Sequence, residues 1–244
     1  TDEPTKVLIK ENKEKIVDML INNPDLSTKF DLNAKTNDGR TPFQIALLKG
    51  NYDMIELLLN RSSSINSTSS KRKSKKNQSS TIDINTPLND GKLPIFVACE
   101  MRRIDIFHLL LKQDKIDLNV QLPTGKSLLY IACQLNLTEI ITELLSWKDI
   151  DVNAPTKFGK TPLFIACEKG NREAIELLIE YNKGSNRKSK NSKKQKSNLV
   201  DFNAKTNEGK TAIMIACEYF RMDIVEMLLQ IEGINCDDPL SNYK

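Results

Sequence analysis

Three residue patterns recur along this chain in the same register. A glycine, an alanine seven residues later and an Asp-apolar-Asn triplet each appear five times, at steps of 52, 34, 34 and 50 residues. Self-similarity at a fixed period predicts a chain built from one repeated unit that packs on its neighbours. The members are Gly39, Gly91, Gly125, Gly159 and Gly209; Ala46, Ala98, Ala132, Ala166 and Ala216; and the triplets beginning at Asp31, Asp83, Asp117, Asp151 and Asp201.

The stretch 151–179 contains the most regular copy of the unit. Its first nine residues are turn-formers that end at Gly159, and Thr161 and Pro162 then supply an N-cap hydroxyl and a residue suited to the first helical position. A first helix should begin at Pro162 and end near Gly170, because glycine readily takes the left-handed conformation. Apolar residues at helical spacing from Ala174 onward predict a second, amphipathic helix.

The unit resembles the ankyrin repeat, which combines a turn, a glycine, Thr-Pro-Leu-His-x-Ala and a helix pair at a period of about 33 residues. The best copies are Gly39-Arg-Thr-Pro-Phe-Gln-Ile-Ala46 and Gly159-Lys-Thr-Pro-Leu-Phe-Ile-Ala166, with weaker ones at Leu93-Pro94, Ser127-Leu128 and Thr211-Ala212. The resemblance implies an all-α, ankyrin-type right-handed solenoid of paired helices joined by hairpin-like turns. Other residues replace the family histidine, and we expect apolar packing there: Gln44, Phe96, Tyr130, Phe164 and Met214.

Two low-complexity inserts interrupt the regular spacing of the repeats. Both enter after the second helix of a repeat, and their few apolar side chains predict mobile loops that break no helix. The predicted segments are a degenerate N-terminal capping repeat at 1–33, repeats at 34–60, 82–115, 116–149, 150–181 and 199–233, basic loops at 61–81 and 182–198, and a truncated repeat or C-terminal cap at 234–244.

The inserts carry most of the positive charge. They hold thirteen Lys and Arg and no acid, so the net charge of +4 for the whole chain leaves −9 for the remainder. Clustered cations attract nucleic acids, anionic membranes or import receptors, whereas the lack of interleaved aromatic residues favours a solvated spacer. Both interpretations stay open. The candidate polyanion or import residues are Lys71, Arg72, Lys73, Lys75, Lys76, Lys193, Lys194 and Lys196.

Four of the five cysteines follow the alanine of the first helix: Cys99, Cys133, Cys167 and Cys217. Equivalent helices in a stack lie about 8–10 Å apart, beyond the roughly 7 Å Cα separation that a disulfide tolerates. We therefore expect reduced core thiols and a cytoplasmic, reducing environment, with the nucleus as the alternative if the basic loops are import signals.

The sequence offers little support for catalysis or metal binding. Gly-Lys-Ser/Thr at Gly125, Gly159 and Gly209 imitates a phosphate-binding loop, but none of the three has the glycine required five residues earlier. The single histidine, His108, falls on the outer face of a second helix, away from the cysteines, which themselves lack zinc-ligand spacing. The Asp-apolar-Asn triplets suit turns better than calcium sites. We expect no enzyme activity, no cofactor and no metal.

What remains is a surface of turn tips and exposed first-helix positions, which the resemblance implies is a concave face that binds another protein. The residue after each glycine is basic, and Glu100, Gln134, Glu168 and Glu218 form a neighbouring, mostly acidic column. The two columns either neutralise each other or give a partner its electrostatic register. The predicted partner-binding residues are Asn37, Asp38, Arg40, Asn89, Asp90, Lys92, Met101, Pro123, Thr124, Lys126, Leu135, Lys157, Phe158, Lys160, Asn207, Glu208, Lys210 and Tyr219.

These observations predict a monomeric, non-catalytic scaffold for protein–protein interaction. Within the chain, no apolar run approaches the roughly 18 residues needed to span a bilayer, so no membrane span is expected. Two alternatives remain. The chain is either an adaptor that uses its basic loops to dock on a polyanion or to enter the nucleus, or the recognition segment of a larger enzyme or channel.

Overall fold

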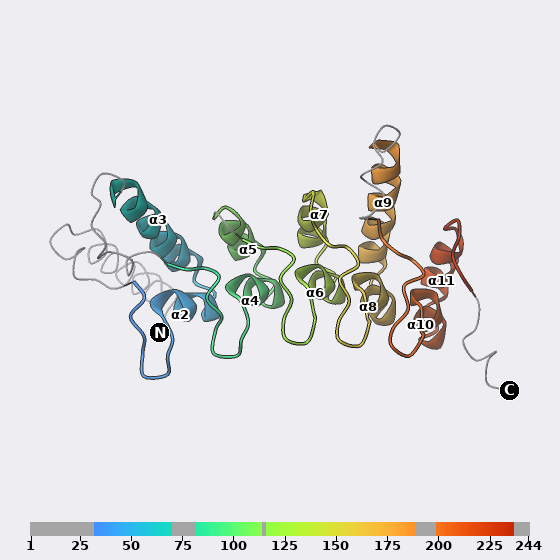
Figure 1. Cartoon of the computed structure of the whole chain (residues 1–244), viewed down its shortest axis with the longest axis horizontal. Coiled ribbons are helices and arrows are strands. Elements are labelled where there is room, and N and C mark those ends of the chain that lie inside the picture. The colour runs from blue at the N-terminus through green and yellow to red at the C-terminus, as the bar shows by residue number, and fades with distance from the viewer. Residues whose placement is uncertain (1–31, 70–81, 114–115, 189–198, 237–244) are drawn as a thin grey trace, which may run out of the picture. The chain divides into compact units, whose positions relative to one another are not determined.

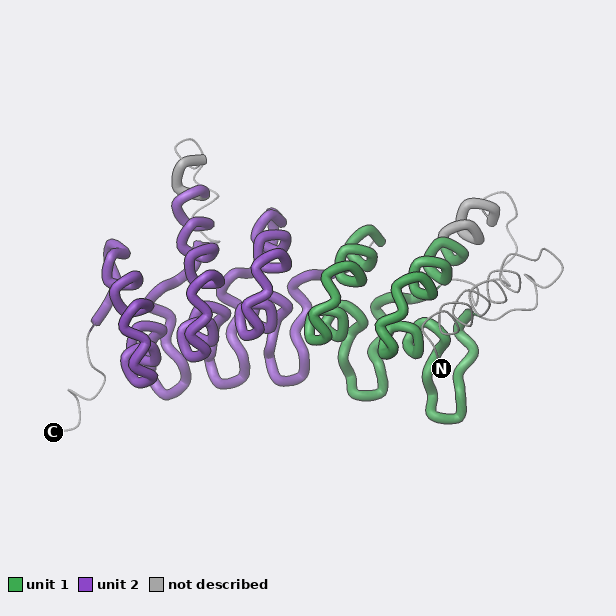
Figure 2. Tube along the Cα trace, turned by 180° about the vertical axis from the view of Figure 1, so that it is seen from behind, with its two compact units in different colours: residues 1–116 green, residues 117–244 purple. Residues whose placement is uncertain are grey.

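The computed structural model describes residues 32–69, 82–113, 116–188 and 199–236 (Figure 1). In these ranges the chain is all-α and its helices come in pairs, as predicted, with an isolated bridge between Gln121 and Ser127 as the only strand-like pairing. The chain divides into two compact units, residues 1–116 and residues 117–244 (Figure 2).

Unit 1 contains two helix pairs within its described residues. The first helices of the two pairs pack on each other, and so do the second helices (Figure 1). The core of these helices includes Phe43, Leu47, Ile55 and Ile106, which are all buried. The pairs are α2 (Pro42–Leu48) with α3 (Tyr52–Ser69), and α4 (Pro94–Glu100) with α5 (Ile104–Leu111).

The described residues of unit 2 contain three helix pairs. Helix α8 begins at Pro162 after the N-cap Thr161, whose hydroxyl accepts a hydrogen bond from the N–H of Phe164 at 3.2 Å, and ends before Gly170 at φ 76°. Both predicted boundaries are therefore confirmed. The pairs are α6 (Leu128–Leu135) with α7 (Thr138–Ser146), α8 (Pro162–Lys169) with α9 (Arg172–Lys188), and α10 (Ala212–Glu218) with α11 (Met222–Leu229).

The turn before each first helix is closed by the same two backbone hydrogen bonds. In the turn at Gly159, the N–H of Thr156 donates to the carbonyl of Lys160 at 2.9 Å, and the N–H of Gly159 donates to the carbonyl of Thr156 at 2.8 Å. Gly159 has φ 75°, a conformation that costs a residue with a Cβ about 1–2 kcal/mol. The glycine pattern thus marks a conformational requirement.

The four Asp-apolar-Asn triplets that lie wholly within the described residues form turns, as predicted. The N–H of Asn153 donates to Oδ1 of Asp151 at 3.0 Å. The asparagine also reaches the next repeat, because its Nδ2 donates to the carbonyl of Leu199 at 2.6 Å and its Oδ1 accepts from the N–H of Asp201 at 2.8 Å. We call this pair of bonds the Asn clamp. Equivalent clamps are made by Asn119 with Asp149 and Asp151, and by Asn203 with Gly233 and Asn235.

The expectation that both inserts are loops from their first residue is wrong. Helix α3 continues to Ser69 and α9 to Lys188, giving 18 and 17 residues against eight or nine in α5, α7 and α11 (Figure 1). No proline or positive-φ glycine ends either helix, so each further residue adds a helical hydrogen bond. We call residues 181–188 of α9 the α9 extension.

Both long helices are tied to the next repeat at equivalent positions. The hydroxyl of Ser62 accepts a hydrogen bond from the N–H of Ile82 at 2.9 Å. Asn182 bonds both backbone polar groups of Val200, at 2.8 and 3.0 Å. These contacts anchor the base of each insert. The rest of the inserts, residues 70–81 and 189–198, and most of the predicted capping repeat lie outside the described residues.

Aromatic side chains fill three of the positions that lack the family histidine. Phe96, Tyr130 and Phe164 are buried, as expected from apolar packing, and Met214 is half-buried. Gln44 departs from the expectation, because its side chain remains in a polar network. It accepts from the N–H of Thr41 at 3.1 Å and donates to the carbonyl of Pro87 at 3.2 Å.

Candidate functional site

The predicted partner-binding residues lie on the turns and at the C-terminal ends of the first helices. We call this set of positions the turn-tip surface and describe it separately in each unit. In unit 1, Arg40, Asn89 and Asp90 come together with Gln44 and Leu48 around a pocket of about 160 Å³. The structure therefore gathers three of the predicted residues at one hollow.

The basic and acidic columns of this surface pair with each other. Arg40 departs from the pattern and contacts Asp38 at 3.1 Å, since Leu48 occupies its place in the acidic column. The hydrogen bonds that Lys92 donates to Glu100 and Lys210 donates to Glu218 raise the pKa of each lysine. The geometry thus favours mutual neutralisation over a surface of unpaired charges. The pairs are Lys92–Glu100 at 2.5 Å, Lys160–Glu168 at 2.6 Å and Lys210–Glu218 at 2.8 Å.

The repeat at residues 116–149 lacks the ion pair between the two columns. Lys126 meets Gln134 rather than a carboxylate, with 3.5 Å between Nζ and Oε1, and its ammonium lies 5.7 Å from the ring centroid of Tyr130. Pro123 and Thr124 in the same turn are exposed. This part of the surface therefore presents a cation that no ion pair within the described residues neutralises.

Two predicted amides are already used within the array. Nδ2 of Asn89 donates to the carbonyl of Asp38 at 2.6 Å, and Nδ2 of Asn207 donates to the carbonyl of Lys157 at 2.9 Å. Each bond joins a turn to the turn before it. These asparagines hold neighbouring turns in register, and a partner would have to contact them through their remaining surface.

Large apolar side chains stand out on the turn-tip surface. Phe158 is 71% exposed, Tyr219 52% and Met101 40%, whereas Leu135 is half-buried. The backbone around Phe158 is fixed, because its carbonyl accepts from the N–H of Asn207 at 3.0 Å, and the neighbouring Lys157 N–H donates to the carbonyl of Thr124 at 3.1 Å. Phe158 is therefore an exposed aromatic side chain on a held turn.

The far side of the last repeat shows apolar exposure that the sequence did not indicate. Phe220 is 85% exposed at φ 54°, and Met222 and Leu229 are also exposed. Met222 and Leu229 are the first and last residues of α11, whereas Phe220 lies in the connection from α10 to α11, at the position that Gly170 occupies in the preceding repeat. In the part of unit 2 that the structure describes, α6 packs on α8 and α8 on α10, but no later helix covers α10 and α11.

In the last repeat, the cysteine also departs from the prediction. Cys99, Cys133 and Cys167 are buried and form no disulfide, and burial raises the pKa of Cys99 and Cys167 to about 12. Cys217 is also free but exposed, so the expectation of a core thiol is wrong at that position. The covering repeat that buries its counterparts in unit 2 has no equivalent among the described residues.

The remaining features of the sequence concern metal binding, the single histidine, membrane insertion and the basic loops. Across the described ranges, no three His, Cys, Asp or Glu side chains are placed to hold a metal ion. His108 is exposed on α5. No helix that the structure describes combines the length and apolar character needed to cross a membrane. The candidate polyanion residues all lie outside the described ranges: Lys71, Arg72, Lys73, Lys75, Lys76, Lys193, Lys194 and Lys196.

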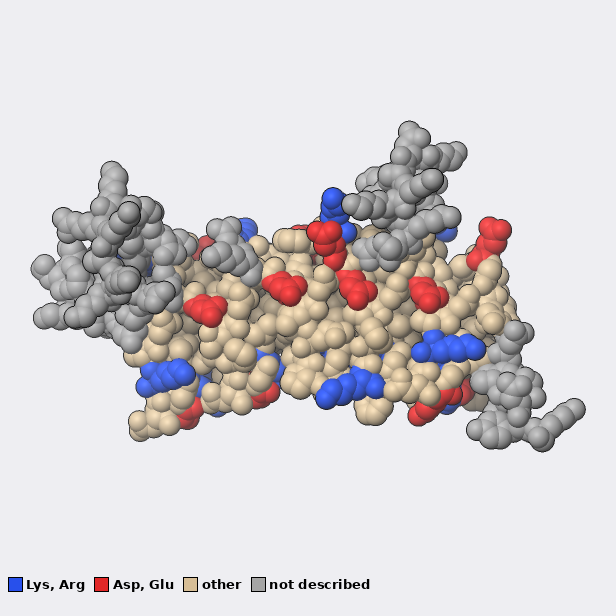
Figure 3. Space-filling model, viewed as in Figure 1, with Lys and Arg blue, Asp and Glu red and all other residues tan. Residues whose placement is uncertain are grey.

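Charge is mixed on the face shown in Figure 3. Over the atoms of each unit not drawn in grey, separate red Asp and Glu patches and separate blue Lys and Arg patches lie on a mostly tan surface, and neither sign covers a continuous area there. Such a surface suits short-range pairing rather than a long-range field that would attract a polyanion.

Two family models match this chain and agree with its turn and helix-pair geometry. The model described as ankyrin repeats (3 copies) matches residues 72–155 and 129–239, which is more than half of the chain. The chain belongs to the ankyrin repeat family. A second model, ankyrin repeats (many copies), matches residues 6–59. No curated protein matches the chain.

Membership of the ankyrin repeat family indicates the general class of function. Ankyrin repeats are typically protein–protein interaction modules and are usually non-catalytic. Both matching models describe ankyrin repeats, and the second one reaches into residues 6–31, where the sequence predicts a degenerate capping repeat.

Proposed function

We propose that this chain is a non-catalytic interaction module that binds a partner protein through its turn-tip surface, with Phe158 and Tyr219 as apolar anchors. The observation that carries the proposal is the 71% exposure of Phe158 on a turn bonded to both neighbouring turns. Interface hot spots are enriched in aromatic residues, and a rigid anchor loses little conformational freedom on binding.

The charge pattern supports apolar anchors over electrostatic ones. Three of the basic column residues are already paired with glutamates, and exposed pairs of this kind contribute about 0–1 kcal/mol each. A partner gains little by competing for them. Lys126, which meets Gln134 and the ring of Tyr130 instead of a carboxylate, is the column cation in unit 2 to which a partner's carboxylate would best bind.

Three buried cysteines without disulfides support the reducing environment that the sequence predicts. Cys99, Cys133 and Cys167 carry no disulfide, which suits a reducing compartment such as the cytoplasm. We infer that the interaction takes place there.

Alanine substitution with a matched aromatic control tests the proposal. A partner is first recovered with the full chain, and its dissociation constant is then measured by calorimetry for wild type, Phe158→Ala, Tyr219→Ala and Phe220→Ala. Burying a phenylalanine contributes about 1.5–3 kcal/mol, so Phe158→Ala should weaken binding by roughly 10- to 100-fold. Phe220 is also an exposed aromatic residue of unit 2, but it lies in the connection between α10 and α11 and is not one of the predicted partner-binding residues.

The outcomes separate this proposal from its alternatives. Phe220→Ala should change the affinity less than about threefold, which is within the range of near-neutral interface contacts. Unchanged affinity for Phe158→Ala, with an unchanged helical circular-dichroism signal, would contradict the turn-tip proposal. Salt-sensitive binding that disappears on deleting residues 70–80 and 189–197 would instead favour the polyanion-docking adaptor.

A further inference from the structure

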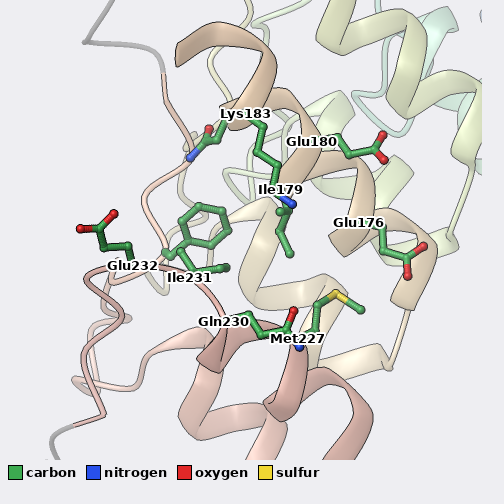
Figure 4. A pocket seen from close by; sticks show the side chains of 10 residues that line it. Glu176, Ile179, Glu180, Lys183, Met227, Gln230, Ile231 and Glu232 are labelled. Atoms are coloured by element: carbon green, nitrogen blue, oxygen red, sulfur yellow. The ribbon is translucent and has the colours of Figure 1, made fainter. Parts of the chain in front are cut away.

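We propose that unit 2 has a second docking site, a groove between α9 and α11 that binds an amphipathic segment of a partner protein with apolar residues flanked by Lys or Arg. The groove has a volume of about 690 Å³ and lies outside the turn-tip surface (Figure 4). We call it the α9–α11 groove.

The groove exists because the second insert lengthens α9. Helix α11 ends at Leu229, which is equivalent to Ile179 in the repeat register, whereas α9 continues to Lys188. The α9 extension therefore stands beyond the end of α11, as Figure 1 shows, and forms one wall of the groove. The opposite wall is the chain that leaves α11, from Gln230 to Glu232.

The wall is held in place before any partner binds. Asn182 lines the groove and forms two hydrogen bonds with the backbone of Val200, which is itself buried. At the other end, Arg172 of α9 lies 3.9 Å from Asp223 of α11. A preformed groove needs little ordering on binding, which preserves affinity.

The floor of the groove is apolar and partly open to solvent. Ile179, Phe202, Met227 and Ile231 line it, and each is half-buried, unlike the core residues beside them. In Figure 4, the side chain of Lys183 extends toward Ile179. Its aliphatic stem provides a cover that an apolar side chain of a partner can replace. Methionine adapts its shape to different occupants.

The rim of the groove is acidic on both edges. Figure 4 shows Glu176 and Glu180 on one edge and Glu232 on the opposite edge, with the apolar side chains between them. Glu176 pairs with Arg172 at 2.9 Å. Glu180 and Glu232 are exposed and make no ion pair with any described residue. Three carboxylates against the single ammonium of Lys183 favour cations beside the apolar residues of the occupant.

A peptide fits this arrangement better than a small molecule. Polar groups that converge on one point would fix a small ligand, but here the carboxylates stand apart on two edges. An amphipathic helix places apolar side chains at i, i+3, i+4 and i+7 and keeps its flanks polar. Such a segment can rest on the floor while its Lys or Arg side chains reach Glu180 and Glu232.

Designed peptides test the proposal directly with the full chain. The probe is a fluorescein-labelled 12-residue peptide with Leu at i, i+3, i+4 and i+7 and Lys at the other positions. One control peptide replaces every Lys by Glu, and another replaces every Leu by Ser. Fluorescence anisotropy should show saturable binding of the Leu/Lys peptide alone. Methyl NMR should show shifts at Ile179, Met227 and Ile231.

Two matched charge reversals locate the binding. Glu180→Lys removes a rim carboxylate, and Glu226→Lys makes the same charge change at an exposed position of α11 outside the groove. Glu180→Lys should weaken peptide binding about fivefold, because it replaces one exposed attraction between the rim and a peptide Lys by repulsion. The affinity of Glu226→Lys for the peptide should stay near that of the wild type. Phe158→Ala should leave peptide binding unchanged, which separates this site from the turn-tip surface.

Any of four results would overturn the proposal: no binding by wild type, equal weakening by Glu226→Lys, equal binding of either control peptide, or methyl shifts confined to other residues. Equal weakening by both reversals would mean that the cationic peptide binds the acidic chain without regard to position.

Discussion

Adding a single methyl group at Gly159 should destabilise the protein more than the same change at Gly209. The two glycines occupy the same position of the same turn, with φ 75° and 79°. A Cβ at Gly159 would lie 2.8 Å from the backbone N of Asn207 and 3.0 Å from Cα of Thr206, whereas a Cβ at Gly209 meets no described atom within 4 Å. The pair therefore separates backbone strain from contact between repeats.

The expected loss in unfolding free energy follows from these contacts. Alanine in the left-handed region costs about 1–2 kcal/mol at either position. Forcing a methyl group into a filled site adds typically about 1–3 kcal/mol. Of these two glycines, the second cost applies to Gly159 alone, because two of the three nearest atoms there belong to the backbone of the next turn. Gly209→Ala should thus lose about 1–2 kcal/mol, and Gly159→Ala roughly 2–5 kcal/mol.

Urea unfolding followed by far-UV circular dichroism measures the difference. With a slope of about 2 kcal/mol per molar urea, an additional 2 kcal/mol moves the midpoint by about 1 M. Gly125→Ala provides a second case, since a Cβ there would lie 2.7 Å from the backbone N of Lys157. Equal midpoints for Gly159→Ala and Gly209→Ala would refute the close stacking of turns in unit 2.

Three further predictions concern the clamps, the thiols and one ion pair. Asn153→Ala removes both bonds of an Asn clamp and should lower the unfolding free energy by about 1–3 kcal/mol, with faster hydrogen exchange at the N–H of Asp201; unchanged exchange would contradict the clamp. In the native protein at pH 8, a thiol reagent followed by peptide mapping should modify Cys217 and Cys236 and spare Cys99, Cys133 and Cys167, and rapid modification of Cys133 would contradict its burial. Hydrogen bonds from Arg103 hold the pKa of Asp105 below its usual 3.8, so this pair stabilises the fold above about pH 4 and the contribution is lost as the pH falls through the folded-state pKa. Asp105→Asn should therefore lower the urea midpoint at pH 7 slightly and not at pH 2.5, and an equal effect at both pH values would contradict the assignment.

Features encoded by neighbouring residues could be predicted from the sequence. The start of α8 at Pro162 and its end before Gly170 follow from capping chemistry, and the Asp151–Asn153 turn follows from the short reach of an aspartate side chain. Each depends on the conformational preference of a few adjacent residues, which any copy of the unit carries with it.

Features that depend on three-dimensional neighbours could not be predicted. The bonds from Asn153 to residues 199 and 201 cross an insert, so they join residues that lie far apart in the chain. The exposure of Cys217 depends on whether a further helix pair covers it, although the local pattern matches that of the buried Cys167.

The α9 extension was missed for a related reason. Its Asn, Gly and Ser residues have weak helix propensity and resemble a linker. The helix continues because no stop residue follows and because Asn182 ties its base to Val200. The groove that this wall creates, and its apolar floor, therefore had no signal in the sequence.

Site-specific photo-crosslinking tests the central claim of partner binding at the turn-tip surface most directly. p-Benzoylphenylalanine replaces Phe158 in one variant of the full chain and Phe220 in another, and the crosslinked proteins are identified by mass spectrometry. The account predicts a discrete protein partner captured at position 158 and absent at position 220. Capture of the same proteins in equal amounts at both positions would contradict it.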